Sequence, residues 1–144
     1  VKEALRLYGP VNQVRRTCKQ TTTVVHGGRA ITVHEGDEVH AAVAFMHHQA
    51  EYFPEPNDFL PERFLVGGPL IAKQNLRAFN PFGMGPRQCV AAKFAMQEAK
   101  LALIILFSKF RFELREGYKM ETEMTATISA RGGVPVHVHP RKKK

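Results

Sequence analysis

Residues 79–93 read FNPFGMGPRQCVAAK, a stretch that runs from a glycine-rich loop into a long apolar segment. Gly83 and Gly85 allow positive φ angles, which turn backbone N–H groups into a concavity suited to a negatively charged atom. Cys89 lies where the loop gives way to a predicted helix, so unsatisfied N–H groups and the positive end of the helix dipole favour its thiolate. A thiolate held in this way is a good metal ligand.

Two other side chains of the stretch extend this prediction. Arg87 would project beside the sulfur, where a guanidinium can pair with a carboxylate of whatever the thiolate holds. Phe82 would form an apolar wall that limits water around the sulfur. A lone cysteine is usually a small buried residue, so the interpretation depends on the whole pattern Phe-x-x-Gly-x-Arg-x-Cys, which runs without a gap from Phe82 to Cys89.

This pattern closely resembles the haem-binding signature of the cytochrome P-450 superfamily, whose cysteine thiolate is the axial ligand of haem iron. One position differs, because Ala91 stands where the family most often has glycine. We interpret this extra methyl group as a packing adjustment. The resemblance implies haem b as cofactor and Cys89 as the metal ligand, with further cofactor contacts from Arg87, Arg16, Phe82, Gly83 and Gly85.

A second motif of the same family opens the chain. Val1 to Tyr8 has helical apolar spacing and is ended by Gly9-Pro10, with Glu3 and Arg6 three residues apart on one face. For an isolated pair the usual expectation is a weak surface ion pair. Here Glu3 and Arg6 resemble the family's Glu-x-x-Arg helix, and Arg63 lies in a matching Pro-Glu-Arg-Phe segment. The resemblance implies a buried structural network of Glu3, Arg6 and Arg63.

Residues 11–44 are expected to form a β region. Thr21–Val25 and Ala30–Val33 are rich in β-branched residues and flank a His-Gly-Gly turn. The family resemblance implies that Arg16, with Arg15 as the alternative, reaches a haem propionate. It also implies that Val11 and Asn12 face substrate. The histidines at positions 26, 34, 40, 47 and 48 lack the paired spacing of a zinc site, so we expect them to be surface or hydrogen-bonded residues.

The rest of the chain divides into three segments. Residues 45–80 are expected to form a short helix, within Met46–Asp58, and an irregular meander. Residues 81–111 comprise the cysteine loop and a long helix, Val90–Phe110, which is apolar over most of its circumference. Residues 112–140 are expected to form strands, including Thr125–Ser129 and Val134–Val138 around an Arg-Gly-Gly hairpin turn. Family resemblance places a second substrate-lining segment at Ala126, Thr127 and Ile128.

The chain's 144 residues suffice for one domain, and 44% of them are hydrophobic. A net charge of +8 is compatible with nucleic acid, an anionic membrane or an acidic protein as partner. No reader motif or basic stripe interleaved with aromatic residues favours nucleic acid. The two cysteines, Cys18 and Cys89, do not form a disulfide framework, so reduced thiols in a cytosol-facing protein are expected.

We therefore expect a fold that is mainly α with smaller β-sheets, the C-terminal portion of the cytochrome P-450 fold. The resemblance, nearest to animal microsomal detoxifying members, implies a monooxygenase that inserts one oxygen atom from O2 into an apolar small molecule. It further implies electron supply from an NADPH-dependent flavoprotein reductase and cytochrome b5, attracted by basic residues such as Lys93. The expected location is the cytosolic face of the endoplasmic reticulum membrane, through an N-terminal anchor absent from this chain.

Two hypotheses from other classes are a basic nucleic-acid-binding module and a thiol enzyme that uses Cys89 as nucleophile. The thiol enzyme would need a base near Cys89, and no residue of the sequence is placed in that role. We also expect the 144-residue chain to be an incomplete, inactive fragment, since the predicted elements are too few to cover the Val90–Phe110 helix. The substrate and its site of oxidation are not specified by the sequence.

Overall fold

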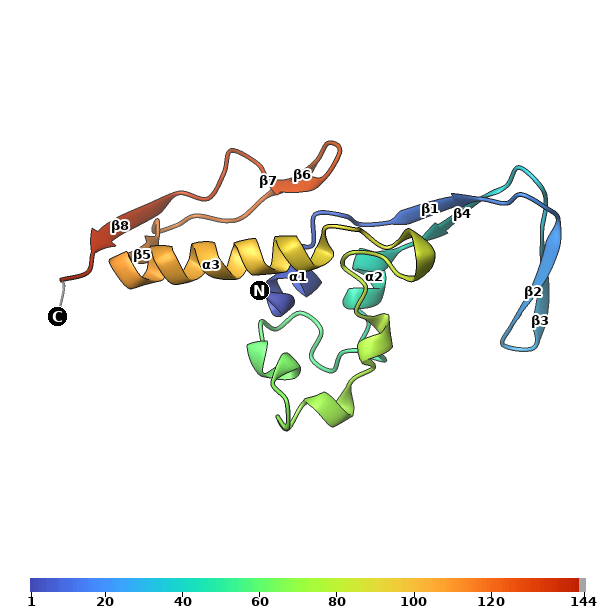
Figure 1. Ribbon diagram of the computed structural model, residues 1–144, viewed down its shortest axis with the longest axis horizontal. Coiled ribbons are helices and arrows are strands. Elements are labelled where there is room, and N and C mark those ends of the chain that lie inside the picture. The colour runs from blue at the N-terminus through green and yellow to red at the C-terminus, as the bar shows by residue number, and fades with distance from the viewer. Residues whose placement is uncertain (143–144) are drawn as a thin grey trace.

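The computed structural model describes residues 1–142. Within them, one long helix, several short helices and four separate two-stranded antiparallel sheets form an elongated body (Figure 1). The α-helices are α1 (Lys2–Tyr8), α2 (Val43–His47) and α3 (Ala92–Lys109). The strands are β1 (Val14–Thr17), β2 (Thr22–His26), β3 (Arg29–Val33), β4 (Glu38–Ala41), β5 (Phe110–Leu114), β6 (Thr122–Met124), β7 (Ile128–Ala130) and β8 (Val136–Pro140).

The first two sheets form a long arm. Strand β1 pairs with β4, and between them β2 and β3 form a hairpin that extends away from the rest of the molecule (Figure 1). Gly27 and Gly28 make the hairpin turn with φ angles of 56° and 76°. Positive φ at both central residues is the geometry of a type I′ turn, which matches the right-handed twist of the strands. The ribbon predicted around His-Gly-Gly is thus confirmed.

The first correction concerns where the β region ends. The expected range 11–44 includes Val43 and Ala44, yet helix α2 begins at Val43. Val43 is only 3% exposed and is one of the few buried apolar residues. Burial of this side chain against its surroundings therefore outweighs the β propensity of valine, and the short helix predicted within Met46–Asp58 lies earlier in the chain.

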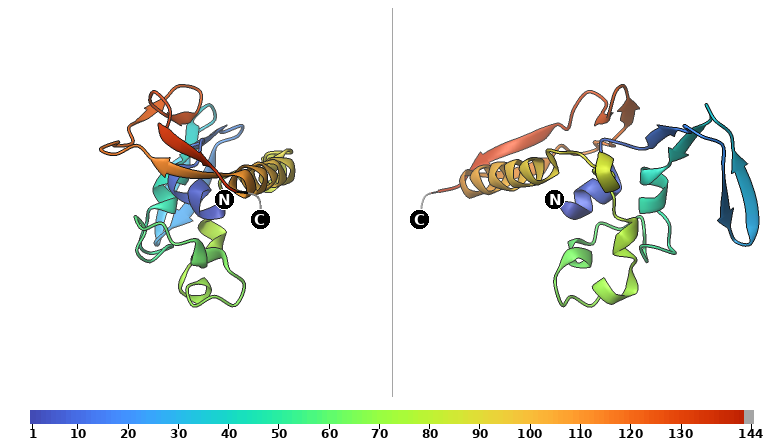
Figure 2. Two further views of the ribbon diagram at one scale, coloured as in Figure 1. Left: turned by 90° about the vertical axis from the view of Figure 1, so that its left-hand side faces the viewer. Right: turned by 45° about the vertical axis from the view of Figure 1, so that its right-hand side comes forward.

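The segment after α2 is an irregular meander, as expected. Phe53 packs at its start and is fully buried, and Ala78 is buried near its end. Short 3-10 turns interrupt it at Pro61–Phe64, Ile71–Lys73 and Leu76–Ala78. In the views of Figures 1 and 2 this meander lies on one side of α1, and the C-terminal strands lie on the other.

Helix α3 is the longest helix of the described residues and carries many exposed apolar side chains. Its large apolar residues include Phe94, which is 66% exposed, and Ile104, which is 65% exposed. None of its residues is buried. The prediction that the other elements are too few to cover this helix agrees with these exposures.

The C-terminal strands differ from the prediction in their pairing. Thr125–Ser129 is not one strand, because the N–H of Thr125 donates to the carbonyl of Thr127 (3.1 Å) and closes a tight turn between β6 and β7. The Arg131-Gly132-Gly133 turn does not join a hairpin, since β8 pairs with β5. Local β propensity predicted strands here. The turn at Thr125–Thr127 and the pairing of β8 with β5 decide which of these residues form strands.

Candidate functional site

The most buried side chains of the described residues are largely charged. Glu3, Arg6 and Arg63 have exposed fractions of 2%, 1% and 0%. The Glu3 carboxylate accepts two hydrogen bonds from Arg6, from Nε and Nη2, both at 2.8 Å. It also accepts one from Arg63 Nε at 3.2 Å. The structure thus brings together the three residues of the expected network, from α1 and the 3-10 turn Pro61–Phe64.

Backbone groups of the meander complete this network. The Leu60 N–H donates to Glu3 at 3.0 Å, and Arg6 Nη1 donates to the carbonyls of His47 (2.7 Å) and Pro56 (2.6 Å). Within residues 1–142, two buried side-chain atoms have no hydrogen-bond partner, Arg63 Nη1 and Gln74 Oε1. Because nearly all other polar atoms of the cluster are paired, the network can hold α1 and the meander in one fixed arrangement.

Opposing effects act on the pKa of Glu3. Burial raises this pKa, while the hydrogen bonds from Arg6 and Leu60 and the positive charges of Arg6 and Arg63 lower it. The net result is a pKa below the ordinary value of 4.5. Glu3 is therefore ionised at neutral pH, as its role of acceptor for two guanidinium groups requires.

His47 lies beside this network and is bound to Arg6 through its backbone carbonyl. From the sequence it is expected to be a surface or hydrogen-bonded histidine. Its side chain is 2% exposed, and its ring is stacked on Phe79 with centroids 5.4 Å apart. The residue lies four positions after Val43 in α2, and both are buried. This i, i+4 spacing of a valine and a histidine is the sequence signal that could have placed His47 inside.

The cysteine loop is closed by backbone hydrogen bonds. The Cys89 N–H donates to the Phe82 carbonyl at 3.0 Å, and the Gln88 N–H donates to the Gly85 carbonyl at 3.0 Å. Gly83 and Gly85 both have φ of 73°, a conformation that side chains with a Cβ rarely adopt. The loop therefore requires glycine at both positions, and it presents Cys89 shortly before α3 begins at Ala92.

Cys89 is a free, exposed thiol, and an apolar hollow adjoins its loop. The hollow has a volume of about 220 Å³. It is lined by Val14, Arg16, Val39, Ala41, Val43, Met46, Asn80, Gly83 and Met84. Arg16 and Arg87 are exposed, and neither forms a salt bridge with a carboxylate of residues 1–142. The loop region thus combines a thiol, an apolar surface and two cationic side chains.

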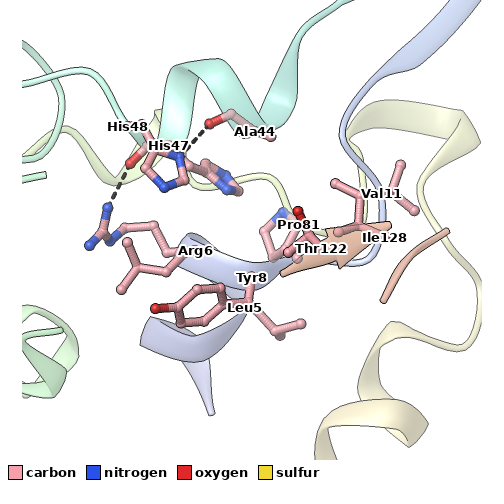
Figure 3. Close-up of a pocket in the computed structure, with 12 residues that line it drawn as sticks. Leu5, Arg6, Tyr8, Val11, Ala44, His47, His48, Pro81, Thr122 and Ile128 are labelled. Atoms are coloured by element: carbon pink, nitrogen blue, oxygen red, sulfur yellow. Dashed lines mark hydrogen bonds between the residues drawn. The ribbon is translucent and has the colours of Figure 1, made fainter. Parts of the chain in front are cut away.

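The two segments expected to line a substrate cavity lie side by side. The Ile128 N–H donates to the Pro10 carbonyl at 2.8 Å, and Asn12 Nδ2 lies 3.0 Å from Met124 Sδ. Val11 and Ile128 line a second hollow of about 180 Å³, which also reaches His47 and is shown in Figure 3. Ala126 and Thr127, in the tip of the β6–β7 turn, are exposed and do not line it.

Comparison with known proteins identifies the family. The model of the cytochrome P-450 family matches residues 1–137. This chain belongs to the cytochrome P-450 family. Its helices and small antiparallel sheets are those of part of the cytochrome P-450 fold, since the heme domain of cytochrome P-450DA superposes with a TM-score of 0.84 at 26% identity. That likeness covers 98% of this chain and 30% of the other.

Relatives among characterised sequences come from several kingdoms. Cytochrome P-450 72A397 of Kalopanax septemlobus is 35% identical over 95% of this chain, and cytochrome P-450 3A16 of Mus musculus is 34% identical over 78%. The alignments span 26% and 21% of these relatives, so the chain spans about a quarter of their length. The plant and animal relatives have similar identities to this chain, so the expected nearness to animal members stays a prediction.

Haem is the cofactor that membership of the cytochrome P-450 family implies, and the residues present fit it. The thiol of Cys89 is a suitable iron ligand and is free. An apolar hollow beside Gly83 suits a porphyrin edge, and Arg16 on its wall suits a carboxylate. No helix in residues 1–142 has the length and apolar character needed to cross a lipid bilayer.

Proposed function

We propose that this chain is the C-terminal part of a haem-thiolate monooxygenase, with Cys89 as the axial ligand of haem b. The observation that carries the proposal is the free, exposed thiol of Cys89 at the end of a loop that Gly83 and Gly85 shape with positive φ. When bound, haem supplies the activation of O2 that allows one oxygen atom to enter an apolar small molecule.

Cys89 is proposed to bind as the thiolate and to donate electron density through its sulfur. The hydrogen bond from its N–H to the Phe82 carbonyl fixes the backbone on which the sulfur is carried. The half-buried ring of Phe82 limits the access of water to this side of the loop. Both effects favour a defined ligand position over an ordinary mobile surface thiol.

Arg16 and Arg87 are proposed to bind the haem propionates. Arg16 borders the apolar hollow beside Gly83 and Met84, and its guanidinium has no acidic partner among residues 1–142. Arg87 lies two residues before the ligand in the 3-10 turn Gly85–Arg87. A guanidinium matches a carboxylate with two parallel hydrogen bonds, so each arginine would hold the cofactor without touching the iron.

The network of Glu3, Arg6 and Arg63 is proposed to support this site without taking part in the chemistry. It joins α1 to the meander that leads into the cysteine loop, and its charges are buried. A second proposed role concerns Val11, Asn12 and the segment 126–128, which would face an apolar substrate. The contact between Ile128 and Pro10, which puts these segments together, supports this placement.

The proposed electron donors are an NADPH-dependent flavoprotein reductase and cytochrome b5. Lys93, at the start of α3, lies four residues after Cys89 and is exposed, so it can attract an acidic partner to the ligand side. The proposed location is the cytosolic face of the endoplasmic reticulum membrane. A relative from Mus musculus agrees with an animal member, and the relatives from the plant Kalopanax septemlobus and the fungus Aspergillus aculeatus make membranes of such organisms further locations to test.

Visible absorption tests the function against the two other classes. The longer protein that carries residues 1–144, purified with haem, is expected to show the red-shifted carbon monoxide complex of a thiolate-ligated haem. A nucleic-acid-binding module would bind a labelled duplex and take up no haem. A thiol enzyme would lose activity on alkylation of Cys89 and would show no Soret band. Absence of a thiolate-type spectrum in a folded protein would contradict the proposal.

A further inference from the structure

His47 lies between the buried charged network and the segment that leads into the cysteine loop. We infer that His47 is a positioning residue, whose neutral ring accepts a hydrogen bond from the Asn80 backbone and thereby anchors the cysteine loop to the Glu3–Arg6–Arg63 network. This inference rests on the proposed function, because it concerns the loop that is proposed to hold haem. It adds a residue that neither the motifs nor the network includes.

Hydrogen bonds connect the network to the loop through His47. Arg6 Nη1 donates to the His47 carbonyl at 2.7 Å, and the Asn80 N–H donates to His47 Nε2 at 3.1 Å. The next bond runs from the Gly83 N–H to the Asn80 carbonyl at 3.0 Å. The path from Glu3 to the first glycine of the cysteine loop therefore consists of hydrogen bonds through Arg6, His47 and Asn80.

Aromatic packing fixes the ring in the orientation that this path needs. The His47 ring is stacked on Phe79 at an interplanar angle of 29°, and it meets Phe53 edge-on with centroids 6.1 Å apart. Phe79 immediately precedes Asn80, so stacking and hydrogen bonding act on the same short segment. Loss of the ring acceptor would leave the half-buried Asn80 N–H without its partner.

The acceptor role requires an unprotonated Nε2, with the ring proton on Nδ1. Burial is the main cause that lowers the pKa of His47 to about 4. The charges of Arg6 and His48 also lower this pKa, whereas interactions with the backbone of Arg6 and Ala78 raise it. Arg6 from α1 and His48, directly after α2, are the titratable groups that act on the ring. Glu3 and Arg63 are more remote, because they are connected to His47 only through hydrogen bonds by way of Arg6. The residues packed against the ring, Phe53, Phe79 and Asn80, do not titrate. The ring is therefore neutral at neutral pH.

Three substitutions in the longer haem protein separate this role from simple packing. His47→Phe keeps an aromatic ring and removes the acceptor, whereas His47→Gln supplies an amide oxygen that stays an acceptor at any pH. His48→Phe is the matched control, because the His48 ring is half-buried and bonds within α2, to the Ala44 carbonyl (Figure 3). The measurements are the rate of haem loss to an acceptor protein and the carbon monoxide spectrum between pH 7.5 and pH 4.

At neutral pH we expect His47→Phe to lose haem roughly tenfold faster than wild type, the scale of one unsatisfied backbone group. His48→Phe and His47→Gln should stay within about twofold of wild type. On acidification, haem loss from wild type should accelerate as the pH approaches 4, the pKa of His47. This acceleration should be smaller in His47→Gln, whose acceptor does not titrate.

The outcomes for this inference and for the proposed function are distinguishable. A folded wild-type protein without a thiolate-type spectrum would overturn the function, whatever the variants do. A normal wild-type spectrum with equal haem loss in His47→Phe and His48→Phe would overturn the role of His47 alone. If His47→Phe does not fold, the test depends on His47→Gln, and an acid response identical to that of wild type would contradict the inference.

Discussion

The carboxylate of Glu3 binds the guanidinium of Arg63 at 3.2 Å across sixty positions of sequence. Both side chains are buried, with exposed fractions of 2% and 0%. Few apolar side chains are equally buried in the described residues, so charged groups rather than an apolar core connect helix α1 to the meander. Such a connection is specific in geometry and sensitive to the loss of any one partner.

We expect Arg63→Ala in the longer haem protein to lower the free energy of unfolding by about 3–5 kcal/mol, because it leaves Glu3 buried with fewer partners. Haem incorporation should fall in parallel. Urea denaturation followed by circular dichroism measures the change. The matched control is Arg111→Ala, which removes a shorter ion pair, to Glu113 (2.7 Å), on the surface.

Removal of Arg111 should cost at most about 1 kcal/mol, since both partners are roughly half exposed. Equal unfolding free energies for the Arg63→Ala and Arg111→Ala variants would show that burial adds nothing to the network.

Stability is expected to fall in acid through two groups of this cluster. The pKa of His47 is about 4 in the folded chain and about 6.5 when unperturbed, so the unfolded chain binds more protons between these values. The free energy of unfolding therefore decreases as the pH falls from 6.5 to 4, by up to roughly 3 kcal/mol from this group. Above pH 6.5 its contribution is constant.

Glu3 adds a second loss at lower pH. Its pKa is below 4.5 when folded, so the stability that it contributes at neutral pH disappears as the pH falls through the folded pKa. Urea midpoints measured from pH 7.5 to pH 3.5 check both effects. In the His47→Gln variant, the decrease in stability between pH 6.5 and 4 should be absent. A wild-type urea midpoint that stays constant over that range would refute the assignment to His47.

Haem retention should depend on Arg16 and Arg87 separately from iron ligation. Each substitution by Leu is expected to speed haem loss roughly fivefold or more, the scale of a charge-assisted hydrogen bond. Haem that remains should keep its thiolate-type spectrum, because neither side chain ligates iron. Arg29→Leu is the control, since Arg29 is exposed in the extended hairpin of β2 and β3. Retention unchanged in all three variants would contradict the placement.

Much of the site could be predicted from sequence because its motifs are short and their chemistry is strict. Gly83 and Gly85 adopt positive φ, as the glycines of this loop predicted, and Gly85 is the glycine of the pattern Phe-x-x-Gly-x-Arg-x-Cys. Glu3 and Arg6 share a helix face by spacing alone. That they are joined by Arg63 could not come from spacing, since sixty residues of chain separate it from Glu3, and only the family resemblance indicated the contact.

Other features escaped prediction because they depend on tertiary contacts. The spacing puts His47 on one helix face with Val43, but its burial depends on Phe53 and Phe79, which follow it in the meander. The split of Thr125–Ser129 into a turn and the start of β7 depends on one local hydrogen bond and on the pairing of β7 with β6. The β propensity of a segment depends on its own residues, whereas its pairing depends on the strand that lies beside it in the fold.

The 144-residue chain expressed alone is expected to associate and to show no monooxygenase activity. Phe94, Leu101 and Ile104 on α3 have exposed fractions of 66%, 59% and 65%. Continuous apolar surfaces of this kind rarely persist on monomers. Light scattering should show oligomers, and a Leu101→Glu, Ile104→Glu double variant should be more monodisperse. A monomeric, cooperatively melting chain that oxidises an apolar substrate would contradict this expectation.

The central claim is that Cys89 ligates haem iron, and the carbon monoxide spectrum of cysteine variants tests it most directly. Cys18 is the natural control, because it is the other free cysteine and is half-buried beside the β2–β3 hairpin. In the longer haem protein, Cys89→Ser should abolish the thiolate-type band and Cys18→Ser should retain it. A thiolate-type band of equal intensity in wild type and in Cys89→Ser would show that another group ligates the iron.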